Sequence, residues 1–400
     1  MSACRNIPFS LPRAAVVPDY GANGLYGLVG AIRNYLDGQH WAVPGEERPA
    51  RTQDEPVPVL VFLLIDGLGD AFLQRFGAGS ALLAHRRRRM TSVFPSTTAS
   101  AVTTTLTGLA PAQHGLTGWF IHDRRFGGVV APLPMRKRSG GLIRGPMARE
   151  RLFPYPSLFQ NRRRKSIYVN PRSLAYSPYS VRHGRGADRV AYRGIQGMVD
   201  AIATAARALK SAAGGYIHAY YPVFDALSHA HGCESDEVVA QFRHIDAAFA
   251  ALLDELAGTG VDVVASADHG FIDSPAERVI RFERFPEAAA MLAGPLFGER
   301  RAALCELRRG AEDDFRSFVE AELAGKAVLV RSPELLRSGF FGPGPRHRQL
   351  RERIGSHALL MEPGWTITDS VPGEHAHRMI GVHGGLSPQE MWVPLIHARC

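Results

Sequence analysis

The chain has 400 residues, of which 45% are apolar, enough to bury a sizeable core in one large α/β domain with insertions or in two domains. A low aromatic content of 9%, with 41 glycines and 27 prolines, excludes a coiled coil or a disordered chain and favours a loop-rich enzyme. The net charge of +9 comes mainly from arginine runs at 86–89, 162–165 and 346–353. These runs indicate either a solvated face or attraction of an anionic substrate. A nucleic-acid partner is disfavoured because no recognised motif accompanies them.

The cysteine pattern and the hydropathy pattern both predict a cytoplasmic protein. Cys4, Cys233, Cys305 and Cys400 are scattered without a Cys-x-x-Cys pair, which is typical of free thiols in a reducing compartment. Residues 1–18 lack the continuous apolar core of a signal peptide. Since no run of about 18 apolar residues occurs, we expect no transmembrane segment.

The first 56 residues are predicted to be an N-terminal lead and linker, with a helix over 24–35 and a polar linker over 46–58. A continuous apolar run over 57–65 follows, too short for a membrane and typical of a strand covered on both faces of a parallel sheet. Asp66 comes directly after it, at the strand end where open α/β sheets build their sites. A structural aspartate that caps the next helix is the competing interpretation.

Small residues and hydroxyls fill the stretch over 96–108, which follows Pro95 and is predicted to be helical. Threonine is a mediocre helix former, so the six threonines of this stretch weaken a helix. At a helix start, however, hydroxyls cap free N–H groups, and the partial positive charge there attracts phosphate or sulfate. The stretch therefore predicts either a structural cap or a nucleophilic hydroxyl held against an anion.

Strands and helices alternate through the middle of the chain, with strands predicted over 166–169, 215–221 and 261–266 and helices over 195–211 and 236–256. Asp225 and His229 follow the second of these strands. Four residues apart, they lie on one face of a helical turn and can reach one cation. Asp268 and His269 follow the third strand in an Asp-His-Gly turn. The repeated placement of acid and histidine after a strand is more informative than either pair alone.

The last part of the chain is predicted to hold a smaller insert and the final ligand. Residues 276–356 mix charged helices with a Gly-Pro loop and are expected to form a cap. Residues 357–361 are predicted to pair with 365–368 through a Pro-Gly turn. His383 stands in a His-Gly-Gly turn before a final strand over 392–397.

Three carboxylates, three imidazoles and one hydroxyl stand at strand ends or glycine turns: Asp66, Thr98, Asp225, His229, Asp268, His269 and His383. Such a set supplies nitrogen and oxygen ligands for two adjacent divalent cations, which suits zinc, with manganese as the alternative. Two metals about 3.5–4 Å apart can clamp the oxygens of an in-line displacement at phosphorus.

The order strand-Asp, Thr at a helix start, Asp-x-x-x-His, Asp-His-Gly and His-Gly-Gly resembles the alkaline phosphatase superfamily. Within it, the chain resembles the type I phosphodiesterase/nucleotide pyrophosphatase family, from about residue 57 to the C-terminus. The resemblance implies that residues 57–400 form a three-layer α/β sandwich with a central, mostly parallel sheet and a smaller inserted cap.

The resemblance also implies a division of roles. One metal would be held by Asp66, Asp268 and His269, and the other by Asp225, His229 and His383. In the superfamily the nucleophile lies nine residues before the Thr of the Thr-Gly pair. Counting back from Thr107 gives Thr98, which would also bind the first metal, with Thr97 as the alternative nucleophile.

We therefore predict a metal-dependent hydrolase that cleaves phosphodiester or pyrophosphate bonds through a covalent threonine intermediate. A phosphomonoesterase, a phosphonate hydrolase and a phosphomutase on the same core are the alternatives. A non-catalytic binding or regulatory member is less favoured because all seven site positions hold competent residue types. The expected partner is a small anionic phosphate ester, selected by loops over 120–190 and 276–356, and the oligomeric state stays open.

Overall fold

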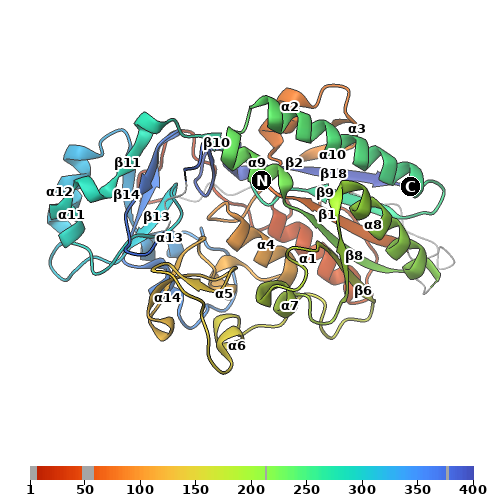
Figure 1. The fold of residues 1–400 in the computed structure, drawn as a ribbon, viewed down its shortest axis with the longest axis horizontal. Coiled ribbons are helices and arrows are strands. Elements are labelled where there is room, and N and C mark those ends of the chain that lie inside the picture. The colour runs from red at the N-terminus through yellow and green to blue at the C-terminus, as the bar shows by residue number, and fades with distance from the viewer. Residues whose placement is uncertain (1–6, 47–57, 212–213, 375–377) are drawn as a thin grey trace.

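The computed structural model describes residues 7–46, 58–211, 214–374 and 378–400, and it is built around a seven-stranded sheet (Figure 1). The strand order is β2-β18-β9-β1-β8-β6-β7. These strands are β1 (Val59–Ile65), β2 (Arg86–Thr91), β6 (Ser166–Pro171), β7 (Asp188–Tyr192), β8 (Gly215–Tyr221), β9 (Asp262–Ser266) and β18 (Trp392–Arg399). Only β18 runs against its neighbours, which confirms the prediction of a mostly parallel sheet.

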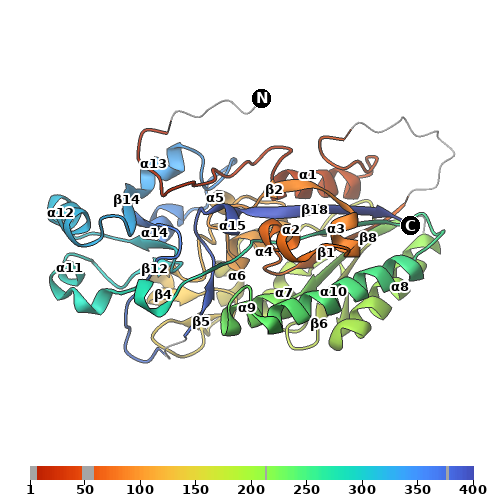
Figure 2. The same cartoon turned by 90° about the horizontal axis from the view of Figure 1, so that it is seen from above.

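Helices cover both faces of this sheet, so every residue of its central strand β1 is buried. Helices α8 (Gly194–Ser211) and α10 (Asp236–Glu255) lie on one side, and α1 (Leu25–Leu36) lies on the other (Figure 2). The predicted three-layer sandwich is thus confirmed. The remaining helices of this part are α2 (Asp70–Phe76), α3 (Ala81–Ala84), α4 (Thr98–Thr107), α5 (Pro111–His114), α6 (Ala148–Leu152), α7 (Pro178–His183), α9 (Val223–His231) and α15 (Pro388–Met391).

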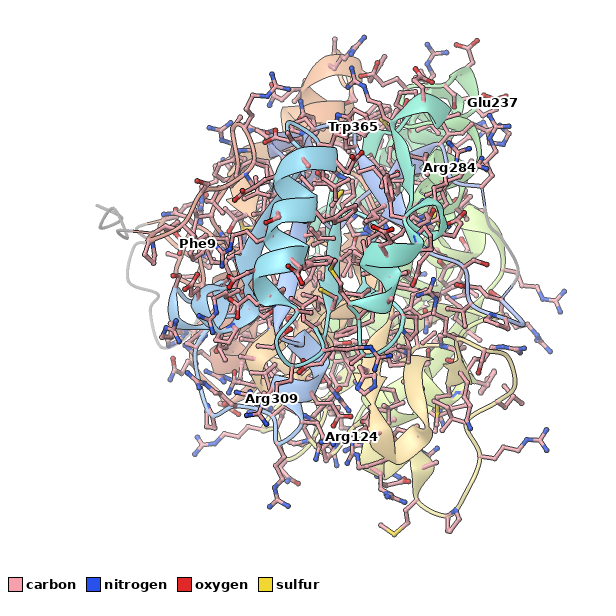
Figure 3. The ribbon with its side chains drawn as sticks, turned by 90° about the vertical axis from the view of Figure 1, so that its left-hand side faces the viewer. Phe9, Arg124, Glu237, Arg284, Arg309 and Trp365 are labelled. Atoms are coloured by element: carbon pink, nitrogen blue, oxygen red, sulfur yellow. The ribbon has the colours of Figure 1, made fainter. Side chains whose placement is uncertain are left out.

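A second lobe is built on an antiparallel sheet of order β12-β13-β15-β14. Figure 3 looks onto this end, where helix α12 covers the sheet between Trp365 and Arg309. The strands are β12 (Phe297–Gly298), β13 (Ala302–Cys305), β14 (Ala327–Arg331) and β15 (His357–Met361), and the helices are α11 (Pro286–Ala290), α12 (Glu312–Glu322), α13 (Ser332–Arg337) and α14 (Leu350–Ile354). The lobe contains the predicted insert 276–356, and the exact domain boundaries stay a prediction.

Three small sheets complete the described chain. One is three-stranded, with β3 (Ile121–Asp123), β4 (Gly128–Ala131) and β5 (Arg136–Lys137). In the others, β10 (Ile272–Asp273) pairs with β17 (Gly381–Val382), and β11 (Val279–Arg281) pairs with β16 (Thr366–Thr368). The β10–β17 pair joins the segment after β9 to the segment before His383.

The predicted hairpin of 357–361 with 365–368 is wrong. The turn itself forms, since the amide of Trp365 donates to the carbonyl of Glu362 at 3.0 Å. Both edges of β15 are already paired, with β13 and with β14, so β16 pairs with β11 instead. The guanidinium of Arg301 donates to the carbonyls of Glu362 and Trp365, which removes these acceptors from any ladder.

The N-terminal segment packs onto the main core rather than standing apart from it. The predicted helix over 24–35 is α1, and the hydroxyl of its buried Tyr35 donates to the carbonyl of Gly215 at 3.1 Å. The predicted linker over 46–58 falls mainly outside the described residues. The segment predicted to be an N-terminal lead therefore contributes α1 to the same core as the sheet.

Two of the arginine runs make structural contacts. Residues 86–89 belong to strand β2, where Arg86 binds Asp70 at 2.6 Å and Arg89 lies over the ring of Trp392 at 4.3 Å. In the second run, Arg164 lies over the ring of Tyr35 at 4.0 Å. These guanidinium groups therefore fix the edge strand and helix α1 in place.

The structure tests part of what the cysteine pattern and the hydropathy pattern predict. Cys233, Cys305 and Cys400 are free thiols, and Cys4 lies outside the described residues. Among the helices described, none combines the length and apolarity that crossing a membrane requires.

Candidate active site

Polar side chains gather where the three central strands end. Asp66 follows β1, Asp225 lies on α9 after β8, and Asp268 follows β9. Since β9, β1 and β8 are neighbours and parallel, their carboxyl ends meet at one edge of the sheet. Helix α4 brings Thr98 to this edge, and the segment after β17 brings His383. The seven predicted site residues therefore converge although they span more than three hundred positions.

The three histidines of the site are oriented by the same kind of hydrogen bond. Each donates from Nδ1 to a backbone carbonyl: His229 to Gly381 at 2.8 Å, His269 to Gly270 at 3.1 Å and His383 to Ser96 at 3.2 Å. Because a carbonyl oxygen only accepts, the ring proton sits on Nδ1 and each neutral imidazole keeps a lone pair on Nε2. This is the arrangement that metal-binding histidines adopt.

Two of these lone pairs face each other. His229 Nε2 and His383 Nε2 are 3.2 Å apart, and Asp225 Oδ1 lies 3.4 Å from the first and 3.8 Å from the second. Neither nitrogen holds a proton to donate, so the three atoms form a cluster of acceptors. Ligands of a tetrahedral zinc ion lie about 3.3 Å apart, and two of the three distances here, 3.2 and 3.4 Å, are close to that value.

A second cluster surrounds His269. Its Nε2 is 3.4 Å from Asp66 Oδ1, 3.4 Å from Asp268 Oδ2 and 3.9 Å from Asp225 Oδ1. The hydroxyl oxygen of Thr98 is 3.2 Å from the same nitrogen. Asp225 Oδ1 thus belongs to both clusters and lies between them.

The chemistry of these atoms fits bound cations. Asp66 Oδ1, Asp225 Oδ1 and Asp268 Oδ2 are buried and have no hydrogen-bond partner. A buried acceptor without a hydrogen-bond partner lowers the free energy of unfolding by about 1–3 kcal/mol, and by more when it is charged. Burial raises the pKa of Asp66 to about 6 and that of Asp268 to about 8, and it lowers the pKa of His229 to about 4. Divalent cations would supply the missing partners and restore the ionised carboxylates.

Comparison with known proteins identifies the family. A model of the type I phosphodiesterase/nucleotide pyrophosphatase family matches residues 60–386, most of the chain. The chain belongs to this family. The predictions of the superfamily and of a phosphodiesterase/nucleotide pyrophosphatase-like enzyme are thereby confirmed. A direct comparison with curated protein sequences finds no match.

Solved structures share the fold. Murine ectonucleotide pyrophosphatase/phosphodiesterase 5 is similar with a TM-score of 0.62 and 16% identity, over 84% of this chain and 87% of that one. An inactive variant of the murine protein, in complex with AMP, is similar with a TM-score of 0.62 and 15% identity, over 84% of this chain and 87% of that one. Phosphonoacetate hydrolase from Sinorhizobium meliloti 1021, in complex with phosphonoformate, gives 0.60 at 18% identity over 86% and 90%.

In this member of the family, the three hydroxyls around the start of α4 have different surroundings. Ser96 donates to the carbonyl of Gly385 at 2.8 Å, and Thr97 donates to Glu299 Oε1 at 2.6 Å. Both of these side chains are fully buried. Thr98, the first residue of α4, is half-buried and points to the second cluster, where its hydroxyl donates to His269 Nε2. Of these three hydroxyls, Thr98 is therefore the one that lies at the second cluster.

Sequence analysis missed three groups that support the site. The hydroxyl of Tyr220, on β8, donates to Asp66 Oδ2, and the amide of Gly67 donates to Asp268 Oδ1 at 3.0 Å. Glu299 reaches the site from the second lobe, and burial raises the pKa of its carboxyl to about 7. No local sequence pattern indicates a role for Tyr220 or Glu299, because each contacts a partner far away in the sequence. Gly67 has a signal, because an Asp-Gly pair after a buried strand predicts a tight turn.

Proposed function

We propose that this family member hydrolyses phosphodiester or pyrophosphate bonds through a covalent intermediate on Thr98. One observation carries the proposal: three imidazole lone pairs and three unpartnered carboxylate oxygens converge beside the one half-buried hydroxyl at the start of α4. When bound, two divalent cations supply Lewis-acid chemistry, which polarises the phosphoryl oxygens and lowers the pKa of the hydroxyl. Zinc suits the mixed nitrogen and oxygen ligands, with manganese as the alternative.

The ligands divide between the two positions as the clusters do. We assign Asp66, Asp268 and His269 to the cation beside Thr98, and Asp225, His229 and His383 to the other. Asp225 Oδ1 lies 3.9 Å from His269 Nε2, so Asp225 would stand beside both cation positions. The backbone carbonyls that fix each Nδ1 hold the rings in place before any cation arrives.

The reaction then proceeds in two displacements. Thr98 Oγ attacks phosphorus in line, the bond to the leaving oxygen breaks, and the hydroxyl proton passes to solvent. Water next attacks phosphorus, the bond to Thr98 Oγ breaks, and the hydroxyl regains a proton. Throughout, the N-terminus of α4 directs its partial positive charge towards the phosphoryl oxygens and stabilises the charge that develops on them.

Chelation and a substrate panel test the proposal. Treatment with a chelator is expected to abolish hydrolysis of bis-p-nitrophenyl phosphate, and zinc or manganese should restore it. Metal analysis should find two equivalents per chain. Faster hydrolysis of p-nitrophenyl phosphate or phosphonoacetate would move the assignment to a monoesterase or phosphonate hydrolase. Full activity after verified metal removal would overturn the metal-dependent mechanism.

The expected partner is a small anionic phosphate ester, and we propose that the protein works in the cytoplasm. The three free thiols, Cys233, Cys305 and Cys400, support a reducing compartment.

A further inference from the structure

A carboxylate of the second lobe ties two loops together at the start of the nucleophile helix. Glu299 stands in the turn between β12 and β13, and its Oε1 accepts two hydrogen bonds. One comes from Thr97 Oγ1 at 2.6 Å and the other from the backbone amide of Trp119 at 2.5 Å. Because both bonds end on one oxygen atom, the backbone of Trp119 lies next to the residue that precedes Thr98.

The residues next to Trp119 are held by the same turn. Phe120 exchanges backbone hydrogen bonds with Gly298, at 3.2 and 2.8 Å. A Cβ atom on Gly118 would lie 2.5 Å from the Cα of Gly298, so the two strands are in close contact. Glu299 itself packs so tightly on Gly384 that a Cβ there would lie 2.7 Å from its side chain. The turn that contains Gly298 and Glu299 therefore holds the backbone on both sides of Trp119, and Gly384 packs against this turn.

The side chain of Trp119 is partly exposed in spite of this support. It is 40% exposed, and within the described residues it is one of six large apolar side chains that are exposed. The neighbouring ring of Phe120 is covered by the guanidinium of Arg138 at 4.8 Å. A partly exposed aromatic side chain thus belongs to a residue whose backbone amide shares Glu299 Oε1 with Thr97, the residue before Thr98.

We infer that Trp119 is a specificity-determining residue, whose indole contacts a planar, apolar substituent of the phosphate ester that Thr98 attacks. The inference rests on the proposed function and names the class of ester. Aromatic side chains give binding energy through area and offset stacking, at low cost in conformational entropy. Glu299 acts through Trp119 and Thr97, so it is a positioning residue.

Two diesters with the same leaving group isolate this contact. Phenyl p-nitrophenyl phosphate and methyl p-nitrophenyl phosphate both release p-nitrophenol, so only the retained substituent differs. We expect Trp119→Ala to lower the ratio of their kcat/KM values, phenyl over methyl, by about tenfold. Trp119→Phe should keep the ratio within about twofold of the parent enzyme, because it preserves a stacking surface. Tyr176→Ala, which removes another exposed aromatic, is the matched control and should leave the ratio unchanged.

A double-mutant cycle tests the positioning role of Glu299. Glu299→Gln should lower the same ratio in the parent enzyme but not further in the Trp119→Ala background. Additive effects of the two substitutions on the ratio would show that Glu299 does not act through Trp119.

The outcomes separate the inference from the proposed function. If the parent enzyme hydrolyses both esters and Trp119→Ala leaves the ratio unchanged, Trp119 does not select the substituent. If Trp119→Ala and Trp119→Phe each lower kcat/KM by the same factor for the phenyl and the methyl ester, the residue is merely structural. If the metal-loaded parent enzyme hydrolyses neither ester, the proposed function fails and the inference fails with it.

Discussion

The seven-stranded core and the second lobe contribute to the site in different ways. Every candidate metal ligand follows a core strand or lies on a helix or turn attached to the core, and each histidine is held by a nearby carbonyl. The second lobe supplies Glu299, which accepts hydrogen bonds from the backbone amide of Trp119 and from Thr97, the residue before Thr98. On the two proposals, the core supplies the reaction chemistry and the lobe supports the residue that selects the substrate, so substitutions in each part should have different signatures.

The largest effect is expected at the nucleophile. Thr98→Ala removes the only atom that forms the covalent bond, and we expect kcat to fall by at least about a thousandfold. Metal content should stay at the parent value, because six other ligands remain. Thr98→Ser retains a hydroxyl and should lose much less activity. A steady-state rate for Thr98→Ala close to that of the parent enzyme would show that the core does not supply the nucleophile in this way.

A buried ion pair joins the second lobe to the core. Arg301, beside β13, binds both carboxylate oxygens of Glu390 on α15 at 3.0 and 2.7 Å, and neither side chain is exposed. Arg301→Met leaves the Glu390 charge without its cation, so we expect the free energy of unfolding to fall by about 3–5 kcal/mol.

The exposed pair of Arg316 and Glu312 on α12 provides the control for that experiment. Arg316→Met should cost less than about 1 kcal/mol, because water already solvates both charges. Urea unfolding of the two variants measures the difference. Equal losses would mean that the Arg301–Glu390 pair does not connect the two regions more strongly than a surface pair does.

Local sequence patterns marked the candidate ligands of the core but not the residues that support them. Asp66, Asp268 and His383 each stand beside an apolar run or a glycine turn, so the pattern of the adjacent residues marks them. Tyr220 and Glu299 act through partners 154 and 202 positions away, and only the folded chain brings these pairs together. Tertiary contacts also decide what local signals leave open.

Two elements show how tertiary contacts override local signals. The Pro-Gly turn after β15 predicted a hairpin, but the neighbours of β15 had already taken both of its edges. The strand over 86–91 was not predicted because four consecutive arginines hide its alternation. Its burial alternates nevertheless, since Arg86 and Arg88 are half-buried while Arg87 and Arg89 are exposed.

The smallest effect is expected from Tyr220→Phe, which removes a hydroxyl but no ligand. The hydroxyl donates to Asp66 Oδ2 and lowers the pKa of this carboxyl, which burial alone raises. Without it the pKa of Asp66 should rise further above about 6, and metal affinity should fall about tenfold. Protons compete with the metal more strongly as pH falls, so the loss should be greater at pH 6 than at pH 8. Competition with a chromophoric chelator measures both affinities.

Tyr221→Phe is the matched control for this variant, because its hydroxyl accepts from Gln241 and does not bind Asp66. It should leave the affinity and its pH dependence unchanged. An affinity loss that is the same at both pH values would mean that Tyr220 shapes the cluster without tuning the carboxylate. The support of the core ligands would then be steric, as it is where Glu299 packs against Gly384.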